Sequence, residues 1–516
     1  MGLHQRFLCR VCISFFKMAG EYLKSQGIDI DAELARIQSK TPPPPGQLPR
    51  TGSVLDSSHV PRPETSQDVE LFRNVSLHHK EGGSRWDVTI GRGQVSNIQP
   101  HVAERGASGS GPSHVVDGHG ALLAPSLCHP HIHLDKAYLL QHPKYAHLQV
   151  SSGTFKEAME LTSKAKAEFE EQDLLERGER LIDESVEAGV SHMRAFVEVD
   201  AGVGMNCLDA GVKLKRQYES QGKCVVQLCA FAQLPLFTSS PNDEDGEKIR
   251  SLMKDAVTKS GIDVIGSTPY VEDSREKQEQ NIDWLIDLAI QHDRHVDFHL
   301  DYHLDAEQAP MVWHVVKSLK DKEFVKRTTS RTIVLGHCTR LLHFSPEEWK
   351  QLAEEIGNLP VSFVGLPTSD FFIHGRTLPI TTLVKEHGLN CCIGVNNIGN
   401  AFTPAGSSDP LLLASMGTSI YKSGTQEDAE LLYECVSTRA KKAIGMDVIR
   451  NWAGEREHGD VGLETLVGDK ANRLLFGSDV KRDWVTRKTI RDVVYFYDGA
   501  KGRRAVLGGQ LTKGSL

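Results

Sequence analysis

Four histidines form the pattern in this sequence that has the clearest chemical meaning. His131 and His133 stand two apart in the run HPHIHLDK, so on an extended strand both imidazoles face the same side, about 6–7 Å apart. His299 and His337 each end an apolar, strand-like run. Neutral imidazoles on one face bind a divalent metal, and a metal with three protein ligands keeps a position for water and lowers that water's pKa toward ~7. The histidines therefore predict a centre that makes hydroxide for hydrolysis. His129 precedes a proline and is expected to face away from the predicted metal centre.

These histidines can meet only if the strands that carry them end at one rim. From residue 121 onward, apolar runs alternate with helix-length segments, of which 156–189 and 276–293 are clearly amphipathic. Eight such units predict an α/β fold, a closed (β/α)8 TIM-type barrel whose active site lies at the C-terminal strand ends. The predicted strands are residues 121–128, 191–199, 224–231, 263–271, 295–300, 332–338, 360–366 and 390–395.

The flanking sequence predicts a second, smaller structural part. Short alternating runs precede the barrel at 70–77, 85–91 and 94–100, and β-like runs follow it at 472–478, 492–499 and 503–509. We expect these runs to pair in one small β-sandwich built from both termini. The Pro-, Ser- and Gly-rich stretch 41–68 reads as a disordered linker. The predicted organisation is a tail and linker at 1–68, a first sandwich part at 69–120, the barrel at 121–455 and a second sandwich part at 456–516.

Composition narrows the functional classes. The 516 residues carry a formal charge of −9 with acids and bases interspersed, which argues against nucleic acid or a membrane as partner; a homo-oligomer is left open. The ten scattered cysteines suit a reduced, cytoplasmic protein, and the lone pair Cys9 and Cys12 does not make a zinc site. Residues 1–20 are basic and apolar, so mitochondrial targeting is an alternative, although an over-extended start before Met18 is preferred.

Several segments resemble one known family. APSLCHPHIHLDK resembles the first-strand motif of the cytosine deaminase branch of the amidohydrolase superfamily. The other resembling segments, in the same order and at roughly the same spacing, are CAFAQLPLF, GIDVIGSTPYVED, VDFHLDYHLDAEQ, LPTSDFFIHGR and GVNNIGNAFTPAGSSDPLLLASMGTSIY. The resemblance covers about residues 69–516. It implies a barrel with an attached β-sandwich, one catalytic zinc or iron, and hydrolysis of amino or amide C–N bonds, usually on pyrimidine or triazine-like rings.

The resemblance also implies roles for individual residues. The implied metal ligands are His131, His133 and His299. His337 would contact the metal-bound water or the oxyanion. Gln233 corresponds to a glutamine that pairs with the substrate ring, and Phe402 to an aromatic wall of the pocket; a solvent-facing loop and plain core packing are their respective alternatives. The implied cofactor is one divalent metal ion, zinc first and iron or manganese as alternatives, and the implied partner is a small nitrogen heterocycle.

Two positions depart from the family pattern, and both concern proton transfer. Asn396 stands where the family has a metal-binding aspartate; its amide can be a weak fourth metal ligand but is not a base. Tyr302 stands where the deaminases have a glutamate, and a phenol of pKa ~10 donates a proton more readily than it accepts one. Asp301 is a candidate replacement base, with a helix cap or a surface acid as the alternative, and His337 is the other candidate. Asp135 and Lys136 would form a supporting ion pair or contact substrate.

Three functions stay open on this sequence. The first is an active, metal-dependent hydrolase acting on a C–N bond of a small nitrogen heterocycle, by deamination or by opening a cyclic amide or amidine. The second is a degenerate, non-catalytic relative that binds a ring compound, which Asn396 and Tyr302 favour. The third is a metal-dependent lyase or isomerase on the same scaffold.

Overall fold

The computed structural model describes residues 68–80, 83–102, 114–238, 244–446, 448–450, 456–458 and 462–512. The chain divides into two compact units, Met1–Arg62 and Pro63–Leu516, and every described residue belongs to the second. The predicted tail, with Cys9, Cys12 and the targeting alternative at 1–20, lies outside the described residues. No helix in the described part is long and apolar enough to span a bilayer.

The predicted (β/α)8 barrel is confirmed. Eight strands follow one another in chain order, and each neighbouring pair is parallel. Beyond the eighth strand, Asn396 pairs with Ile132 of the first, and the amide N–H of His133 donates to the Asn396 carbonyl at 2.8 Å, so the sheet closes on itself. The barrel strands are β6 (Leu127–His133), β7 (Val190–Glu198), β8 (Val225–Ala232), β9 (Ile262–Ser267), β10 (His295–Leu300), β11 (Ile333–His337), β12 (Val361–Gly365) and β13 (Cys391–Ile393).

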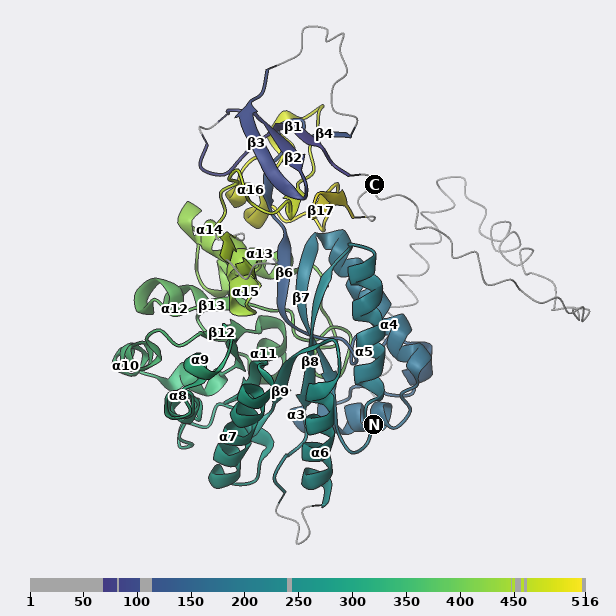
Figure 1. Cartoon of the computed structure of the whole chain (residues 1–516), viewed down its shortest axis with the longest axis vertical. Coiled ribbons are helices and arrows are strands. Elements are labelled where there is room, and N and C mark those ends of the chain that lie inside the picture. Colours follow the sequence, from purple (N-terminus) through teal and green to yellow (C-terminus); the bar gives the residue numbers. More distant parts are fainter. Residues whose placement is uncertain are drawn as a thin grey trace, which may run out of the picture. The chain divides into compact units, whose positions relative to one another are not determined.

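Helices alternate with these strands and cover the outside of the barrel (Figure 1). Their bounds are α3 (Phe155–Lys166), α4 (Glu171–Ala188), α5 (Asn206–Ser220), α6 (Glu244–Thr258), α7 (Arg275–His292), α8 (Val312–Asp321), α9 (Phe324–Arg327), α10 (Pro346–Ile356), α11 (Pro367–His374), α12 (Ile380–His387), α13 (Pro410–Ile420), α14 (Gln426–Cys435) and α15 (Thr438–Ala443). The amphipathic stretch 156–189 is two helices rather than one, because Glu170 is extended and forms a capping box with Asp173 that starts a new helix.

The first strand begins later than the sequence indicated. The apolar run 121–128 is split: β5 (Leu123–Pro125) pairs antiparallel with β16 (Arg473–Leu475) in another sheet, and the barrel strand starts at Leu127. The HxH pair consequently lies inside β6, at its C-terminal end, rather than in the loop after it. A continuous apolar run cannot reveal where a chain leaves one sheet and enters the next, since both sides are buried.

Two four-stranded sheets at the ends of the chain share one core. The first contains β1 (Leu71–Val75), β2 (Trp86–Gly91), β3 (Gln94–Pro100) and β4 (Val115–Asp117); the second joins β5 and β16 to β17 (Arg504–Leu507) and β18 (Gln510–Leu511). Phe72 and Val88 pack in the same cluster as Leu475 and Val506, so both chain ends build it, as expected. A short antiparallel pair, β14 (Val448–Arg450) and β15 (Arg456–His458), stands apart. The exact domain boundaries proposed above stay predictions.

One predicted strand of this part is wrong. Residues 492–499 read as a strand, but Ile490–Tyr495 form helix α16. Thr489 and Asp492 make a capping box, and the spacing of Ile490, Val493 and Val494 buries one helical face. Paired valines favour a strand on propensity alone, and the cap overrides them.

Candidate active site

Three imidazoles converge inside the mouth of the barrel. His299 Nε2, on β10, lies 3.1 Å from His131 Nε2 and 3.0 Å from His133 Nε2, and all three side chains are buried. One proton can join His299 Nε2 to only one of these neighbours, so hydrogen bonding alone leaves the trio unsatisfied. The spacing is close to the edge of a tetrahedron with metal–nitrogen bonds of 2.0–2.1 Å, which is about 3.3 Å. The donor set and its geometry therefore fit a divalent transition metal.

The surroundings keep these imidazoles neutral and make room for them. Burial lowers the pKa of His131, His133 and His299 well below the usual value, which maintains the form that ligates a metal. A Cβ added at Gly336 would lie 3.1 Å from His131 Cε1, and one at Gly394 would lie 3.2 Å from His131 Cβ. Glycine at these two positions leaves the space that the ring occupies.

A buried ion pair lies behind His131. Arg194 donates to Asp297 Oδ2 at 2.9 Å, and Asp297 Oδ1 lies 3.8 Å from His131 Nδ1. Burial raises the pKa of Asp297 to about 7, against the opposing effect of Arg194. A carboxylate behind a ligating imidazole commonly fixes the ring's orientation, and Asp297 is placed for that role.

Asn396 lies in the pocket with its amide held on one side only. Its Nδ2 donates to Ser369 Oγ at 2.9 Å, and Ser369 Oγ lies 2.6 Å from Thr403 Oγ1. Asn396 Oδ1 is buried and has no hydrogen-bond partner within the described chain. The backbone is left-handed here (φ 66°), a conformation that asparagine tolerates better than most residues. The amide therefore has an oxygen available for a ligand and a nitrogen already fixed.

His337 forms a buried dyad with Asp370, a partner that was not among the residues predicted from the sequence. Its Nδ1 lies 2.8 Å from Asp370 Oδ1, and the other Asp370 oxygen accepts from the Leu366 amide and the Thr377 hydroxyl. Because an ionised carboxylate only accepts, the imidazole proton sits on Nδ1 and Nε2 is left as an acceptor. Asp370 follows the seventh barrel strand within LPTSDFFIHGR, and the rule that strand ends carry function could have found it.

Tyr302 lies against His337 but does not resemble a base. Their ring centroids are 3.8 Å apart, and the phenol donates to the Ser369 carbonyl at 3.3 Å. Burial, and then the nearby Asp370, raise the pKa of Tyr302 well above its ordinary value. The phenol therefore keeps its proton.

Most of the predicted site residues line one narrow pocket, and the two that do not are His131, whose Nε2 contacts the lining residue His299, and Asp301. Its lining consists of His133, Lys136, Phe155, Gln233, Tyr270, His299, Tyr302, His337, Ser369, Asn396, Asn397 and Phe402. Asp301 is absent from this lining: its two carboxylate oxygens accept from the backbone amides of Met311 and Val312 at the start of α8, at 2.9 and 3.2 Å. Asp301 is thus a buried helix cap, the alternative weighed above, and its left-handed backbone (φ 48°) turns it away from the side that His299 faces.

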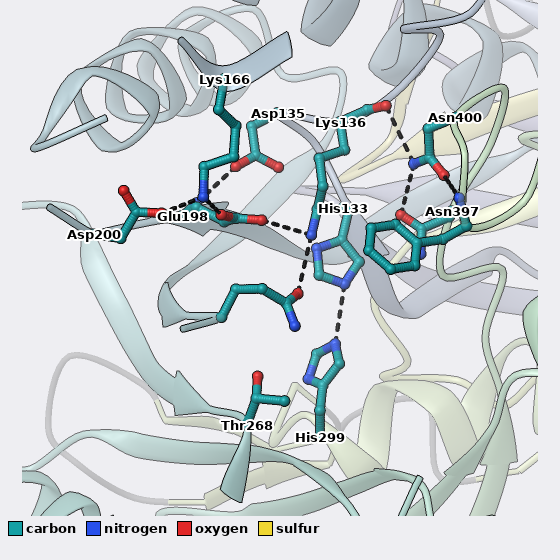
Figure 2. A network of polar contacts seen from close by, with 12 residues as sticks. His133, Asp135, Lys136, Lys166, Glu198, Asp200, Thr268, His299, Asn397 and Asn400 are labelled. Carbon is teal, nitrogen blue, oxygen red and sulfur yellow. Dashed lines mark hydrogen bonds and ion pairs between the residues drawn. The ribbon is translucent and has the colours of Figure 1, made fainter. Parts of the chain in front are cut away.

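Lys136 connects the pocket to a buried charge cluster (Figure 2). Its Nζ lies 2.7 Å from Glu198 Oε1, donates to Gln233 Oε1 at 3.1 Å, and sits 5.4 Å from the centre of the Phe402 ring. Lys166 pairs with both Glu198 and Asp200. Lys136 thus pairs with Glu198 rather than with Asp135, which accepts from the Glu198 amide at 2.7 Å.

Gln233 and Phe402 are both held in place by Lys136. Because Gln233 Oε1 accepts from the ammonium, its Nε2 is the end left for the pocket. Phe402 also packs against Phe155, with ring centroids 5.8 Å apart. His129, as expected, faces away: its Nε2 lies 3.1 Å from Ser185 Oγ on α4.

Comparisons with known proteins agree with this architecture. The model of the amidohydrolase family matches residues 122–448, which is most of the chain, and the chain therefore belongs to that family. A search of curated proteins finds no match.

Solved structures share the fold at low identity. A 5-methylcytosine deaminase from Klebsiella pneumoniae liganded with 5-fluorocytosine aligns with TM-score 0.69 and 20% identity, over 86% of this chain and 96% of that one. An N-isopropylammelide isopropylaminohydrolase from Burkholderia multivorans gives 0.66 and 19%, over 86% and 99%. A guanine deaminase from C. acetobutylicum with bound guanine gives 0.54 and 14%, over 86% and 99%.

Proposed function

We propose that this protein hydrolyses a C–N bond of a small nitrogen heterocycle, by deamination or by opening a cyclic amide or amidine. The observation that carries the proposal is the convergence of the Nε2 atoms of His131, His133 and His299 within a buried pocket. Family membership and relatives that bind 5-fluorocytosine and guanine support the bond type and the ligand class.

The three imidazoles would hold one divalent metal, zinc first, with the Asn396 oxygen as a weaker fourth ligand. Such a cation, when bound, supplies a Lewis acid and makes hydroxide from water at neutral pH. The chain's part is to present three neutral nitrogens and one neutral oxygen in a buried, preformed arrangement, which needs little reorganisation on binding.

His337 is the residue that would take and return the proton. Asn396 is not a base, Tyr302 keeps its proton, and Asp301 caps a helix, so the proton carriers expected of a deaminase are missing. His337 lines the pocket with its Nε2 available as an acceptor because Asp370 fixes the other nitrogen. Once protonated, the same imidazole can donate to the departing nitrogen, while Asp370 stabilises its positive charge.

The remaining pocket suits a flat ring with hydrogen-bonding edges. Phe155, Tyr270, Tyr302 and Phe402 supply aromatic walls, and Lys136 holds the Gln233 amide with its nitrogen toward the pocket. A ring that offers an acceptor to Gln233 and a face to Phe402 would be fixed in one orientation. We therefore propose Gln233 and Phe402 as substrate-binding residues.

The test is turnover of a heterocycle panel by protein reconstituted with Zn²⁺, Fe²⁺ or Mn²⁺. Aminopyrimidines, aminotriazines and cyclic amides are assayed for ammonia or ring-opened product by mass. Hydrolysis is supported by a ring-opened product that has gained one water, or by release of ammonia with the amino group of the substrate replaced by oxygen. A product of unchanged mass identifies an isomerase, fragments formed without uptake of water identify a lyase, and binding without turnover identifies a non-catalytic relative.

Asp370→Asn tests the assigned base within the same assay. The amide can donate to Nδ1 and so selects the wrong tautomer of His337, and we expect kcat to fall by about 10²–10⁴-fold with metal content unchanged. Asp305→Asn, an exposed carboxylate outside the pocket, is the matched control. Full activity of Asp370→Asn would remove His337 from the proton-transfer role.

A further inference from the structure

A second group of metal-type donors lies far from the barrel mouth in sequence and in fold. His78 and His79 follow strand β1 of the sandwich, and Glu430 lies on helix α14. One ligand atom from each lies within 4.8 Å of the other two. The described residues contain one other such group, the three barrel histidines.

The geometry of the two histidines is not that of an ordinary surface loop. Their ring centroids are 3.7 Å apart, and His79 holds a left-handed backbone (φ 59°), which places consecutive side chains together instead of on opposite sides. Two protonated imidazoles this close would repel each other, so the arrangement favours neutral rings. Burial and, to a smaller extent, the neighbouring His79 lower the pKa of His78, which also favours the neutral ring.

His78 has an unsatisfied nitrogen that faces the carboxylate. The side chain is 8% exposed, and its Nε2 is buried without a hydrogen-bond partner among the described residues. Glu430 Oε2 lies 4.0 Å away, too far for a hydrogen bond. Glu430 Oε1 accepts from the Gln426 side chain at 3.0 Å, which orients the carboxylate and leaves Oε2 toward the imidazole.

We propose that His78, His79 and Glu430 form a second metal site that takes a divalent ion of the Zn²⁺ class. Two imidazoles and one carboxylate are the donors that such ions prefer, and the hard ions Ca²⁺ and Mg²⁺ favour all-oxygen sets. Bound ligand atoms would stand about 3.3 Å apart, so separations of up to 4.8 Å would have to close by up to about 1.5 Å, a movement that the exposed His79 and half-buried Glu430 side chains can share. Water would complete the coordination.

This site would tie the sandwich to the barrel. The histidines belong to the β1–β2 connection, and α14 packs against α13 and α15 of the barrel as well as against α16 near the C-terminal end of the chain. A metal that binds only when both parts are in place stabilises their contact by mass action. The proposal is independent of the catalytic one, since none of its residues lines the pocket.

Metal stoichiometry on the full-length, chelator-stripped protein tests the site, with Zn²⁺ as the probe. We expect wild type to bind two equivalents, and His79→Ala and Glu430→Gln one each, with heterocycle turnover preserved. His131→Ala should also bind one, and His131→Ala/His79→Ala none. His119→Ala, an exposed imidazole that also has a left-handed backbone and lies 3.4 Å from a carboxylate, and Glu427→Gln on the same helix are the matched controls.

The outcomes separate cleanly. Loss of one equivalent in both His79→Ala and Glu430→Gln, but in neither control, supports the site. Two equivalents in His79→Ala, or no binding at all in correctly folded His131→Ala, overturns it. Should His131→Ala fail to fold, the comparison of wild type with His79→Ala and Glu430→Gln still decides, because these exposed or half-buried positions leave the core intact.

Discussion

Two buried polar regions meet at the segment from His133 to Lys136, and they are organised in opposite ways. On one side, His131, His133 and His299 bring three nitrogens together with hydrogen bonds that cannot all be made. On the other side, Lys136 and Lys166 face Glu198 and Asp200, and each charge has a partner of opposite sign (Figure 2). Both regions are nearly inaccessible to solvent.

The difference separates a binding site from a support. Unsatisfied buried polar groups are expensive, so a cluster of them implies a ligand that satisfies them. Burial alone would raise the pKa of Glu198, yet the two lysines outweigh it and lower the pKa to about 2, so that carboxylate stays charged and paired. The charge cluster around Lys136 holds Gln233 and Phe402 in position, whereas the three histidines have nitrogens available for a ligand.

The largest expected effect comes from removing one nitrogen of the unpaired region. If the proposed function holds, His131→Ala or His299→Ala should lower the metal bound per chain by about one equivalent and abolish turnover, since each would supply one of the three proposed ligands. Elemental analysis after dialysis measures it, with the exposed His147→Ala as control. Undiminished metal content in either variant would mean that the convergence has another purpose.

The sequence was sufficient to predict that the histidines lie together, but it was insufficient to predict the cluster of paired charges beside them. The chain has 23 histidines, so residue type alone does not single any of them out. His131, His133, His299 and His337 could be found because they stand at the ends of predicted barrel strands, which the barrel brings together. Glu198 ends an apolar run that predicts strand β7, but Lys166 lies on α3 among other surface-type charges, and nothing in the sequence indicates that the two residues pair. Their partnership depends on where a helix returns across the barrel mouth.

Asp301 and Asp370, which lie closer to the histidines, also show what the sequence could not predict. Both follow barrel strands, and residue type gave no reason to prefer one as functional. The backbone determines which of the two carboxylates reaches the pocket residues. The left-handed conformation at Asp301 directs its carboxylate to the start of α8, while Asp370, within α11, faces His337. The fold itself was predictable because eight alternating runs specify closure, whereas the junction at 121–128 depended on long-range pairing.

The next effect tests whether the charge cluster is a support. Lys136→Met removes one partner of Glu198 but leaves Lys166, so the free energy of unfolding should fall by less than the ~3–5 kcal/mol that a wholly unpaired buried charge costs. Denaturant titration measures it. The double variant Lys136→Met/Glu198→Gln removes both charges and should recover part of the loss; a double variant as unstable as the sum of the singles would show that the two charges are not coupled.

Another buried carboxylate, Glu272, sharpens the contrast, because the described residues offer it N–H donors and no ion-pair partner. Glu272 accepts from the amide of Leu236 at 2.8 Å and from the Asn281 side chain at 2.7 Å. Burial raises its pKa from 4.5 to about 6, despite these bonds. The folded state therefore keeps the proton to higher pH than the unfolded state, and the contribution to stability present below pH 4.5 is lost as pH rises to about 6.

Glu272→Gln should remove this pH dependence. Relative to wild type, the variant should gain about 2 kcal/mol in total as the pH rises from well below 4.5 to well above 6, with most of the gain between these two values, on top of any constant offset from changed hydrogen bonds. Unfolding measured at several pH values gives the difference curve. A flat curve over that window would show that the carboxylate ionises normally despite its burial.

The smallest expected effect lies at Ser369, because this fully hydrogen-bonded residue contacts Asn396, whose oxygen is unsatisfied. Its hydroxyl bonds both Asn396 Nδ2 and Thr403 Oγ1, so a satisfied group orients one whose oxygen is unsatisfied. Ser369→Ala would release the amide to rotate, and groups that orient metal ligands typically contribute 10–100-fold in affinity. Because Asn396 would be a neutral and weak ligand, we expect about tenfold weaker metal binding, measured by chelator competition. Thr403→Val, which leaves the Ser369–Asn396 bond in place, should weaken binding less. If both variants bind the metal as tightly as wild type does, the Asn396 oxygen is close to the metal but does not contribute to its affinity, and the three imidazoles hold the metal without it.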